Sequence, residues 1–267
     1  MRTLLNAALD AGLNVIDTGE CYHGSEEMIG NTVSHRRHEY FLFSKCGHSG
    51  KDFGLADWDP KLLELTIERS LKRLKTDRLD LLQVHSCSLE MLQQGDVIAV
   101  VEKAKKAGKT RFIGYSGDGA AARYAVECGR FDTLQTSCSI ADQESIELSI
   151  PLAKERHMGV ICKRPVANVA WHSKGTYLGG YDKAYYERLL ALAYDFLDEP
   201  LADAVSTALR FTLSVPGVTT AIVGTKTPER WRQNAELLKA GPLPAAQFEA
   251  IRKRWREVAQ DDWVGLT

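Results

Sequence analysis

The stretch NVIDTGECYHGSEEMIG, residues 14–30, starts as a short apolar strand and continues into a helix. The loop between them carries Asp17 and Tyr22, followed by His23. A loop that only reverses the chain would favour Gly, Pro, Asn and Ser, so these ionisable groups indicate chemistry rather than a simple turn. We therefore expect Asp17 and Tyr22 to belong to a functional site.

The same strand-then-helix pattern is repeated along the whole chain. Short apolar runs that predict strands cover residues 13–18, 40–46, 79–85, 110–116, 133–139, 159–164 and 220–224. They are continuous rather than alternating, which suits parallel strands buried on both faces. Helical spacing fills the segments between them, for example over residues 91–107. No linker rich in Pro, Gly or Ser interrupts the pattern, which predicts a single α/β domain over residues 1–267.

Two α/β architectures fit this pattern. One is a closed (β/α) barrel, whose active site lies at the C-terminal ends of the strands. The other is an open doubly wound sheet that binds a dinucleotide. Residues 117–122 match its G-x-G-x-x-A fingerprint after a predicted strand, and Asp142 lies 25 residues beyond Gly117, near the place of a ribose-binding acid. The pattern alone leaves both architectures open.

Composition excludes several classes of function. The formal net charge of −1 lacks the basic stripe of a nucleic-acid-binding protein, so no nucleic-acid partner is predicted. No apolar run reaches ~18 residues and no signal peptide is present, so we expect no membrane association and a cytoplasmic location. The six cysteines form no Cys-x-x-Cys pair, which predicts reduced thiols and no metal site.

Four ionisable residues stand at or just after the ends of three successive predicted strands. They are Asp17, Tyr22, Lys45 and His85. Each alone has an ordinary structural explanation, such as a lysine that extends to solvent. In a parallel barrel these strand ends lie side by side on one rim, so the four side chains would converge. Their common position on three strands therefore predicts a catalytic set.

These motifs resemble those of the aldo-keto reductases, over nearly the whole chain. GLNVIDTGECYHGSEEMIG (residues 12–30) is similar to the family's Gly-x-Asn-x-x-Asp-Thr-Ala-x-x-Tyr-Gly-x-Ser-Glu signature. SLKRLKTDRLDLLQVH (70–85) is similar to its Ser-Leu-x-x-Leu-x-x-Asp-x-x-Asp-Leu-x-x-x-His signature, and IVGTKTPERWRQNAE (222–236) resembles its C-terminal cofactor signature. The resemblance implies a (β/α)8 TIM barrel that reduces small aldehydes or ketones with NADPH, with Asp17, Tyr22, Lys45 and His85 as the catalytic set.

Physical chemistry gives each of these four residues a role in carbonyl reduction. Free tyrosine has a pKa of ~10, which is too high for efficient acid catalysis near neutrality. We expect the Lys45 cation to lower the pKa of Tyr22, and Asp17 to pair with the otherwise costly buried Lys45. His85 would donate a hydrogen bond to the substrate oxygen and orient it.

The resemblance also implies residues that bind NADP(H). At the nicotinamide carboxamide these are Ser116 and Gln135, and at the adenosine end they are Thr225, Lys226, Arg230 and Asn234. The motif Thr227-Pro228 predicts a helix start, and helix N-termini bind phosphate. An ordinary capped helix with solvated cations is the alternative. Gly117 stands where the family usually has Asn, and Lys163 where an aromatic ring often stacks on the nicotinamide.

A larger departure concerns the start of the chain. The family has a first barrel strand before the helix that precedes GLNVIDTG, whereas this chain starts inside that helix, at Met1. We therefore expect about seven of the eight strands. Besides a reductase acting on a small-molecule carbonyl, two functions remain open: a cofactor-binding regulatory or structural barrel with little turnover, and a truncated inactive reductase.

Overall fold

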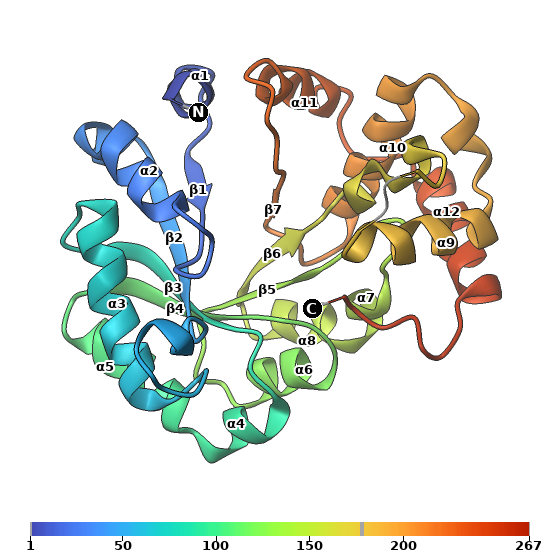
Figure 1. The fold of residues 1–267 in the computed structure, drawn as a ribbon. Coiled ribbons are helices and arrows are strands. Elements are labelled where there is room, and N and C mark those ends of the chain that lie inside the picture. Colours follow the sequence, from blue (N-terminus) through green and yellow to red (C-terminus); the bar gives the residue numbers. More distant parts are fainter. Residues whose placement is uncertain (1, 177–178, 267) are drawn as a thin grey trace. The chain divides into compact units, whose positions relative to one another are not determined.

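The computed structural model describes residues 2–176 and 179–266. In this part of the chain, seven strands form one sheet whose spatial order is the chain order, from β1 to β7 (Figure 1). The strands are β1 (Val15–Asp17), β2 (Phe41–Cys46), β3 (Leu79–His85), β4 (Thr110–Ser116), β5 (Thr133–Ser137), β6 (Gly159–Lys163) and β7 (Thr220–Ile222). The pairings β1–β2, β2–β3, β3–β4 and β6–β7 are parallel.

The strand order decides between the two predicted architectures. A doubly wound sheet reverses its strand order at a switch point, whereas a (β/α)8 barrel keeps its strands in chain order. The observed order is that of the barrel, with seven of its eight strands in the described residues. The predicted barrel class is confirmed and the open sheet is wrong. Residues 117–122 are the ordinary connection from β4 into helix α6 (Gly119–Glu127).

Helices follow the strands along the chain. The other α-helices are α1 (Arg2–Asp10), α2 (Ser25–Val33), α3 (Pro60–Leu74), α4 (Leu89–Gln94), α5 (Asp96–Lys106), α7 (Glu144–Leu148), α8 (Ile150–Glu155), α9 (Tyr181–Leu192), α10 (Leu201–Ser214), α11 (Arg230–Leu238) and α12 (Ala245–Val258). Short 3-10 helices are η1 (Ser34–Glu39), η2 (Gly50–Asp52), η3 (Ala167–Ser173) and η4 (Asp195–Asp198). The single helix predicted over residues 91–107 is wrong, because Gly95 adopts a φ of 85° and separates α4 from α5.

The chain divides into two compact units. The first comprises residues 1–134 and 224–233, and the second comprises residues 135–223 and 234–267. The prediction of one domain over residues 1–267 stays a prediction.

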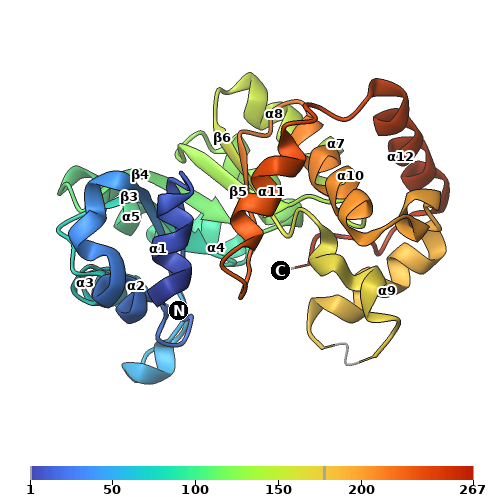
Figure 2. The ribbon, with the colours of Figure 1, turned by 90° about the horizontal axis from the view of Figure 1, so that it is seen from above.

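In the first unit, parallel strands are buried beneath α-helices. Residues Leu79–Val84 of β3 are all buried, as expected for a strand covered on both faces. The helices α1, α2 and α3 lie next to one another in this unit (Figure 2). Helix α3 starts where the Asp59 carboxylate accepts a hydrogen bond from the backbone N–H of Lys61 at 2.7 Å. The apolar stripe of α3 is buried, and the helix packs against β2 through it.

In the second unit, α9, α10 and α12 enclose a separate apolar core (Figure 1). Phe211 of α10 stacks on Phe248 of α12 with ring centroids 5.0 Å apart. Trp255 contacts Trp263, with centroids 5.5 Å apart. The C-terminal segment is thus packed into this unit rather than lying free.

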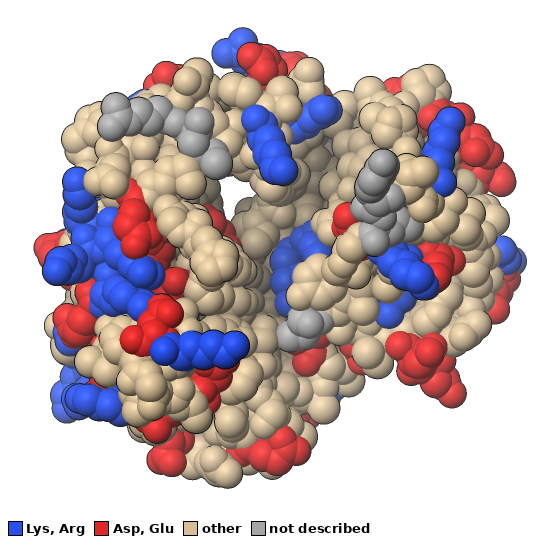
Figure 3. Space-filling view, viewed as in Figure 1, with Lys and Arg blue, Asp and Glu red and all other residues tan. Residues whose placement is uncertain are grey.

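Basic and acidic side chains lie among one another on the face shown in Figure 3. Among the ion pairs of the described residues, Arg36 pairs with Asp10 at 2.8 Å and Lys103 pairs with Glu64 at 2.7 Å. No helix in the described part of the chain has both the length and the apolar character that crossing a membrane requires.

Candidate active site

A buried ion pair joins the first two strands. Asp17 ends β1 and Lys45 lies near the end of β2, and their side chains are only 8% and 2% exposed. Lys45 Nζ donates a hydrogen bond to Asp17 Oδ1 and another, at 2.8 Å, to the backbone carbonyl of Thr18. Burial opposes the charge and tends to lower the pKa of Lys45, but Asp17 and Tyr22 outweigh it and raise that pKa. Lys45 is therefore a stable buried cation.

Tyr22 lies above this cation. A tight turn brings it there, because the backbone N–H of Tyr22 donates to the carbonyl of Gly19 at 3.0 Å. Gly19 leaves room for the ring, since a β-carbon at this position would lie 3.3 Å from it. Lys45 Nζ is 5.2 Å from the centroid of the Tyr22 ring, within the range of a cation–π interaction. The Tyr22 side chain is 43% exposed, so a substrate can reach it.

The acidity of Tyr22 differs from the expectation. Partial burial raises the pKa of Tyr22, and the attraction of Lys45 and a hydrogen bond from it offset only part of that rise. Lys45 thus lowers the pKa of Tyr22, as expected, but the resulting pKa lies above the ordinary tyrosine value and not below it. The physical reason is that burial destabilises the phenolate by more free energy than the attraction of Lys45 restores. Lys45 is itself paired with Asp17, which weakens its effect on Tyr22.

His85 completes the group from the end of β3. Its ring meets the Tyr22 ring nearly edge-on, at 5.8 Å between centroids and an interplanar angle of 82°. His85 Nδ1 is 3.7 Å from Cys21 Sγ, and the His85 carbonyl accepts a hydrogen bond from Trp58 Nε1 at 2.7 Å. Burial raises the pKa of the Cys21 thiol to about 11, so this thiol stays protonated near neutrality. The structure thus brings together all four residues predicted for catalysis.

Sequence reasoning missed Gln83. Lys45 and Gln83 are register partners on β2 and β3, and Gln83 Nε2 donates to Asp17 Oδ2 at 3.3 Å. Asp17 is therefore held by both Lys45 and Gln83. The available signal was the amide of Gln83 in the run LDLLQVH, two residues before His85, since alternate residues of a strand share a face.

The residues predicted for cofactor binding are distributed over the two units. Ser116 ends β4 opposite His85 in the strand register and is buried, and it belongs to the first unit with Thr225, Lys226 and Arg230. Gln135 and Asn234 belong to the second unit. The assignment of these six residues to a cofactor stays a prediction.

The structure explains one departure from the family motif. A β-carbon at position 117 would lie 2.4 Å from the hydroxyl of Tyr115, so a side chain larger than hydrogen does not fit there. Tyr115 in turn donates to the carbonyl of Cys87 at 2.8 Å, which fixes its ring in place. The glycine at 117 is therefore required by its neighbour, and no amide side chain is available from this position.

The segment after β7 is less regular than expected. The predicted start at Thr227-Pro228 is wrong, because α11 begins at Arg230. Instead, Thr225 Oγ1 accepts a hydrogen bond from the backbone N–H of Thr227 at 3.0 Å and closes a turn. Lys226 and Arg230 are exposed, and in the described residues neither charged group has an ion-pair partner. Two unpaired cations beside a turn suit an anionic group such as a phosphate.

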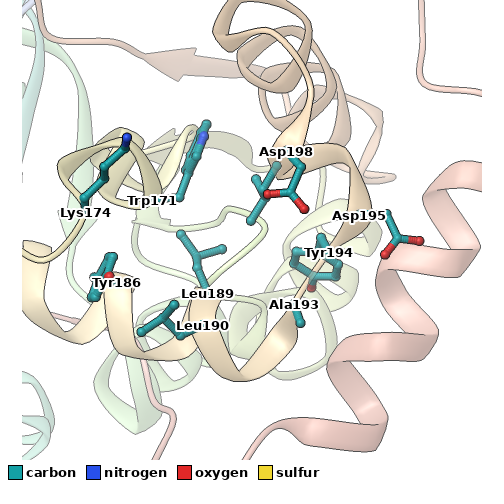
Figure 4. Close-up of a pocket in the computed structure, with 10 residues that line it drawn as sticks. Trp171, Lys174, Tyr186, Leu189, Leu190, Ala193, Tyr194, Asp195 and Asp198 are labelled. Carbon is teal, nitrogen blue, oxygen red and sulfur yellow. The ribbon is translucent and has the colours of Figure 1, made fainter.

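A pocket of about 420 Å³ lies elsewhere, in the second unit (Figure 4). It is bounded by η3, α9 and η4, and Trp171, Tyr186 and Leu189 line it. None of the residues predicted for catalysis or for the cofactor is among its lining residues. In the described residues, no group of three or more His, Cys, Asp or Glu side chains is arranged to hold a metal ion.

Comparison with known proteins gives one family. A model of the Aldo/keto reductase family matches residues 1–256. The uncharacterized oxidoreductase YqkF of Bacillus subtilis is 27% identical over 271 residues, covering 96% of this chain and 87% of the relative. The L-galactose dehydrogenase of Arabidopsis thaliana is 31% identical over 172 residues, covering 60% of this chain and 53% of the relative.

Solved structures give the same result for the fold. An aldo-keto reductase of Bacillus halodurans in its holo form has a TM-score of 0.82 at 24% sequence identity, covering 98% of this chain and 89% of that one. An aldo/keto reductase of Klebsiella pneumoniae in complex with NADP and acetate has a TM-score of 0.74 at 22% identity, covering 100% of this chain and 88% of that one.

Proposed function

The chain belongs to the aldo/keto reductase family, whose members are NAD(P)-dependent oxidoreductases, and we propose that it reduces small aldehydes or ketones to alcohols with NADPH. One observation carries the proposal: the buried Lys45–Asp17 pair lies beneath an accessible Tyr22 that faces His85. This arrangement offers a proton and a positive charge at one point, which is what a carbonyl oxygen needs as it gains negative charge.

The proposed proton donor is Tyr22. Because its pKa is raised, the hydroxyl is protonated near neutral pH and is ready to donate. Tyr22 Oη gives its proton to the carbonyl oxygen as that oxygen takes up the π electrons of the C=O bond. The resulting phenolate is stabilised by Lys45, and solvent returns the proton because the Tyr22 side chain is partly exposed.

The other residues prepare this step. His85 donates a hydrogen bond to the same carbonyl oxygen and fixes its direction relative to Tyr22. Asp17 keeps Lys45 charged, and Gln83 keeps Asp17 in place. NADPH, when bound, supplies the hydride that adds to the carbonyl carbon.

Several observations support NADP(H) as the cofactor. The exposed, unpaired cations Lys226 and Arg230 fit the 2′-phosphate, and Thr225 lies beside them. Ser116, buried at the end of the strand next to His85, together with Gln135 is assigned to the nicotinamide amide by the family motif. Asn234 is assigned to the adenosine end in the same way. A structural neighbour binds NADP, and a relative from Schizosaccharomyces pombe is named as NADP(+)-dependent.

The test is the consumption of NADPH by the purified chain in the presence of a simple aldehyde such as propionaldehyde. We expect turnover that depends on both components. Tight NADPH binding without turnover would instead support the alternative of a regulatory or structural barrel. Turnover that persists when Tyr22 is changed to Phe would contradict the proposed mechanism.

A further inference from the structure

The loop from Gly47 to Trp58 places a second histidine beside the proposed site. The His48 ring meets His85 at 4.8 Å between centroids with an interplanar angle of 87°, and it meets Trp58 at 4.8 Å and 65°. The rings of Tyr22, His85, His48 and Trp58 therefore follow one another as neighbours. His48 takes no part in the proton transfer described above.

This loop is built to hold His48 in one position. Ser49 and Trp58 adopt φ angles of 68° and 59°, a left-handed conformation that such residues rarely adopt. The backbone N–H of Trp58 donates to the carbonyl of Gly47 at 2.6 Å, and a β-carbon on Gly47 would lie 2.7 Å from the Trp58 ring. Strained backbone that is fixed by its neighbours is typical of functional sites.

Asp57 determines which nitrogen of His48 carries a proton. Asp57 Oδ2 lies 3.3 Å from His48 Nδ1, and Asp57 Oδ1 accepts a hydrogen bond from the backbone N–H of Gly50 at 2.9 Å. A carboxylate only accepts hydrogen bonds, so in the neutral form of the imidazole Nδ1 is the donor and Nε2 is left as an acceptor. In the part of the chain that the structure describes, no hydrogen bond occupies Nε2, and the side chain is 27% exposed.

The charges around His48 define the kind of group that it would accept. Asp57 pairs with it, and the buried Glu20 is close enough for the two to interact electrostatically. A substrate carboxylate would meet both acidic residues, whereas a neutral hydroxyl would meet a free acceptor. His85 donates to the carbonyl oxygen, and the His48 ring is its direct neighbour. A substrate whose carbonyl oxygen binds at His85 would therefore bring its adjacent carbon close to this second ring.

We propose that His48, held by Asp57, is a specificity-determining residue that accepts a hydrogen bond from a hydroxyl group on the carbon next to the substrate carbonyl. The preferred substrates are then neutral α-hydroxy aldehydes or ketones. This inference rests on the proposed reductase function, and its test separates the two. The probes are glycolaldehyde and propionaldehyde, which differ by a hydroxyl group in place of a methyl group.

The experiment measures kcat/KM with NADPH for both aldehydes in wild type and in variants. His48→Phe should lower the value for glycolaldehyde by roughly two- to tenfold, the worth of one neutral hydrogen bond, and change the value for propionaldehyde little. His48→Gln keeps an acceptor and should retain most of the glycolaldehyde activity. Asp57→Ala should act in the same direction as His48→Phe. Comparing each variant with wild type on one aldehyde cancels differences in aldehyde hydration.

His38→Phe is the matched control, because His38 is exposed on η1 and none of the four rings contacts it. Thermal unfolding shows whether each variant is folded. Equal losses on both aldehydes, no loss with His48→Phe, or a His48→Gln variant that behaves like His48→Phe would each overturn the inference. If wild type reduces neither aldehyde, the proposed function itself is wrong and this inference is wrong with it.

Discussion

Burial raises the pKa of the Tyr22 hydroxyl and the Lys45 ammonium lowers it, and burial has the larger effect. A raised pKa weakens the tyrosine as an acid in the resting chain, but it also guarantees that the proton is present at neutral pH. The oxygen of a reacting carbonyl becomes strongly basic, so a weak acid that is always loaded can still donate. Lys45 then contributes by stabilising the phenolate that remains.

Removal of the Tyr22 hydroxyl tests this role directly. Tyr22→Phe should lower carbonyl reduction by about 10²–10⁴-fold, the usual effect of losing a general acid. NADPH binding should be nearly unchanged, because the ring stays in place. Tyr124→Phe, on α6, is the control and should keep full activity. Similar rates for Tyr22→Phe and wild type, measured with one aldehyde, would remove Tyr22 from the mechanism.

Glu26 provides a prediction about pH. Its side chain is buried in α2 and accepts a hydrogen bond from Ser44 Oγ at 2.7 Å, and burial raises its pKa above the ordinary value of 4.5. Above pH 4.5 the folded chain therefore holds this proton more firmly than the unfolded chain, and stability falls as pH rises through the folded pKa. Glu26→Gln cannot ionise, so its stability relative to wild type should increase over that pH interval.

Urea unfolding of both proteins between about pH 4 and 8 measures this difference. Glu257→Gln, at an exposed position of α12, serves as the control and should show no such pH dependence. A difference between Glu26→Gln and wild type that stays constant across the interval would mean that Glu26 is not destabilised by burial.

Helices α2 and α3 support the loop that carries Tyr22. Gly30 of α2 lies so close to α3 that a β-carbon there would be 2.1 Å from the carbonyl oxygen of Arg73. The Arg73 side chain pairs with Glu27 at 2.6 Å and donates to the backbone carbonyl of Glu20 at 3.2 Å. The contact between the two helices thus reaches the residues immediately before Tyr22.

An added methyl group at Gly30 should separate these helices. Gly30→Ala should destabilise the chain by about 1–3 kcal/mol, the usual cost of overpacking. Asn31→Ala, at the next and exposed position of the same helix, should change stability by less than about 0.5 kcal/mol. Chemical unfolding measures both. Equal stability of the two variants would show that α2 and α3 adjust freely to each other.

Helix α11 offers a prediction about cofactor choice. A charged hydrogen bond is worth ~1.5–3 kcal/mol, so Arg230→Ala should weaken NADPH binding by roughly ten- to a hundredfold and leave NADH almost unchanged. Arg232→Ala removes an exposed charge from the same helix and should affect neither cofactor strongly. Titration with both cofactors gives the constants. Equal losses for NADPH and NADH would mean that Arg230 supports the helix and does not contact the phosphate.

The sequence predicted elements well where a local signal was strong. Helix α3 carries such a signal, because Asp59 and Pro60 stand at its start and an apolar stripe follows them. The loop after β1 likewise shows its chemistry in Asp17 and Tyr22. It failed at Gly95, because a helix pattern that continues across a glycine does not reveal a left-handed turn. The sequence also did not reveal that Gln83 contacts Asp17, because cross-strand partners depend on the folded chain. It did not predict the raised pKa of Tyr22, because the extent of burial is likewise set by folding.

Across the whole molecule, the chain order of the strands is what an α/β pattern alone could not predict. The fingerprint at residues 117–122 favoured a doubly wound sheet, and only the family motifs favoured the barrel. The four proposed catalytic residues could be found because they stand at strand ends, where the barrel class brings side chains together. His48 could not, because its position depends on two backbone angles within one loop.

Cofactor binding should raise the thermal stability of the folded chain. At a free NADPH concentration of about 100 times its dissociation constant, the gain is about 2.7 kcal/mol, which corresponds to roughly 5–10 °C in Tm for a chain of this size. NADH at the same concentration should give a smaller shift. Thermal unfolding followed by circular dichroism measures both. The absence of any shift with NADPH would argue against NADP(H) as the ligand.

The first unit also has a consequence for recombination between genes of this family. Asp17, Tyr22, Lys45 and His85 lie between residues 17 and 85, and the pairs that hold them, such as Gln83–Asp17, lie within the same segment. A crossover inside this segment combines contacting residues from two different parents, such as Asp17 from one and Gln83 from the other. A crossover beyond His85 keeps all of these residues from the same parent. In a library of chimaeras with a relative, active members should have few breakpoints between residues 17 and 85. Sequencing the active members would show this, and breakpoints spread evenly over the chain would contradict it.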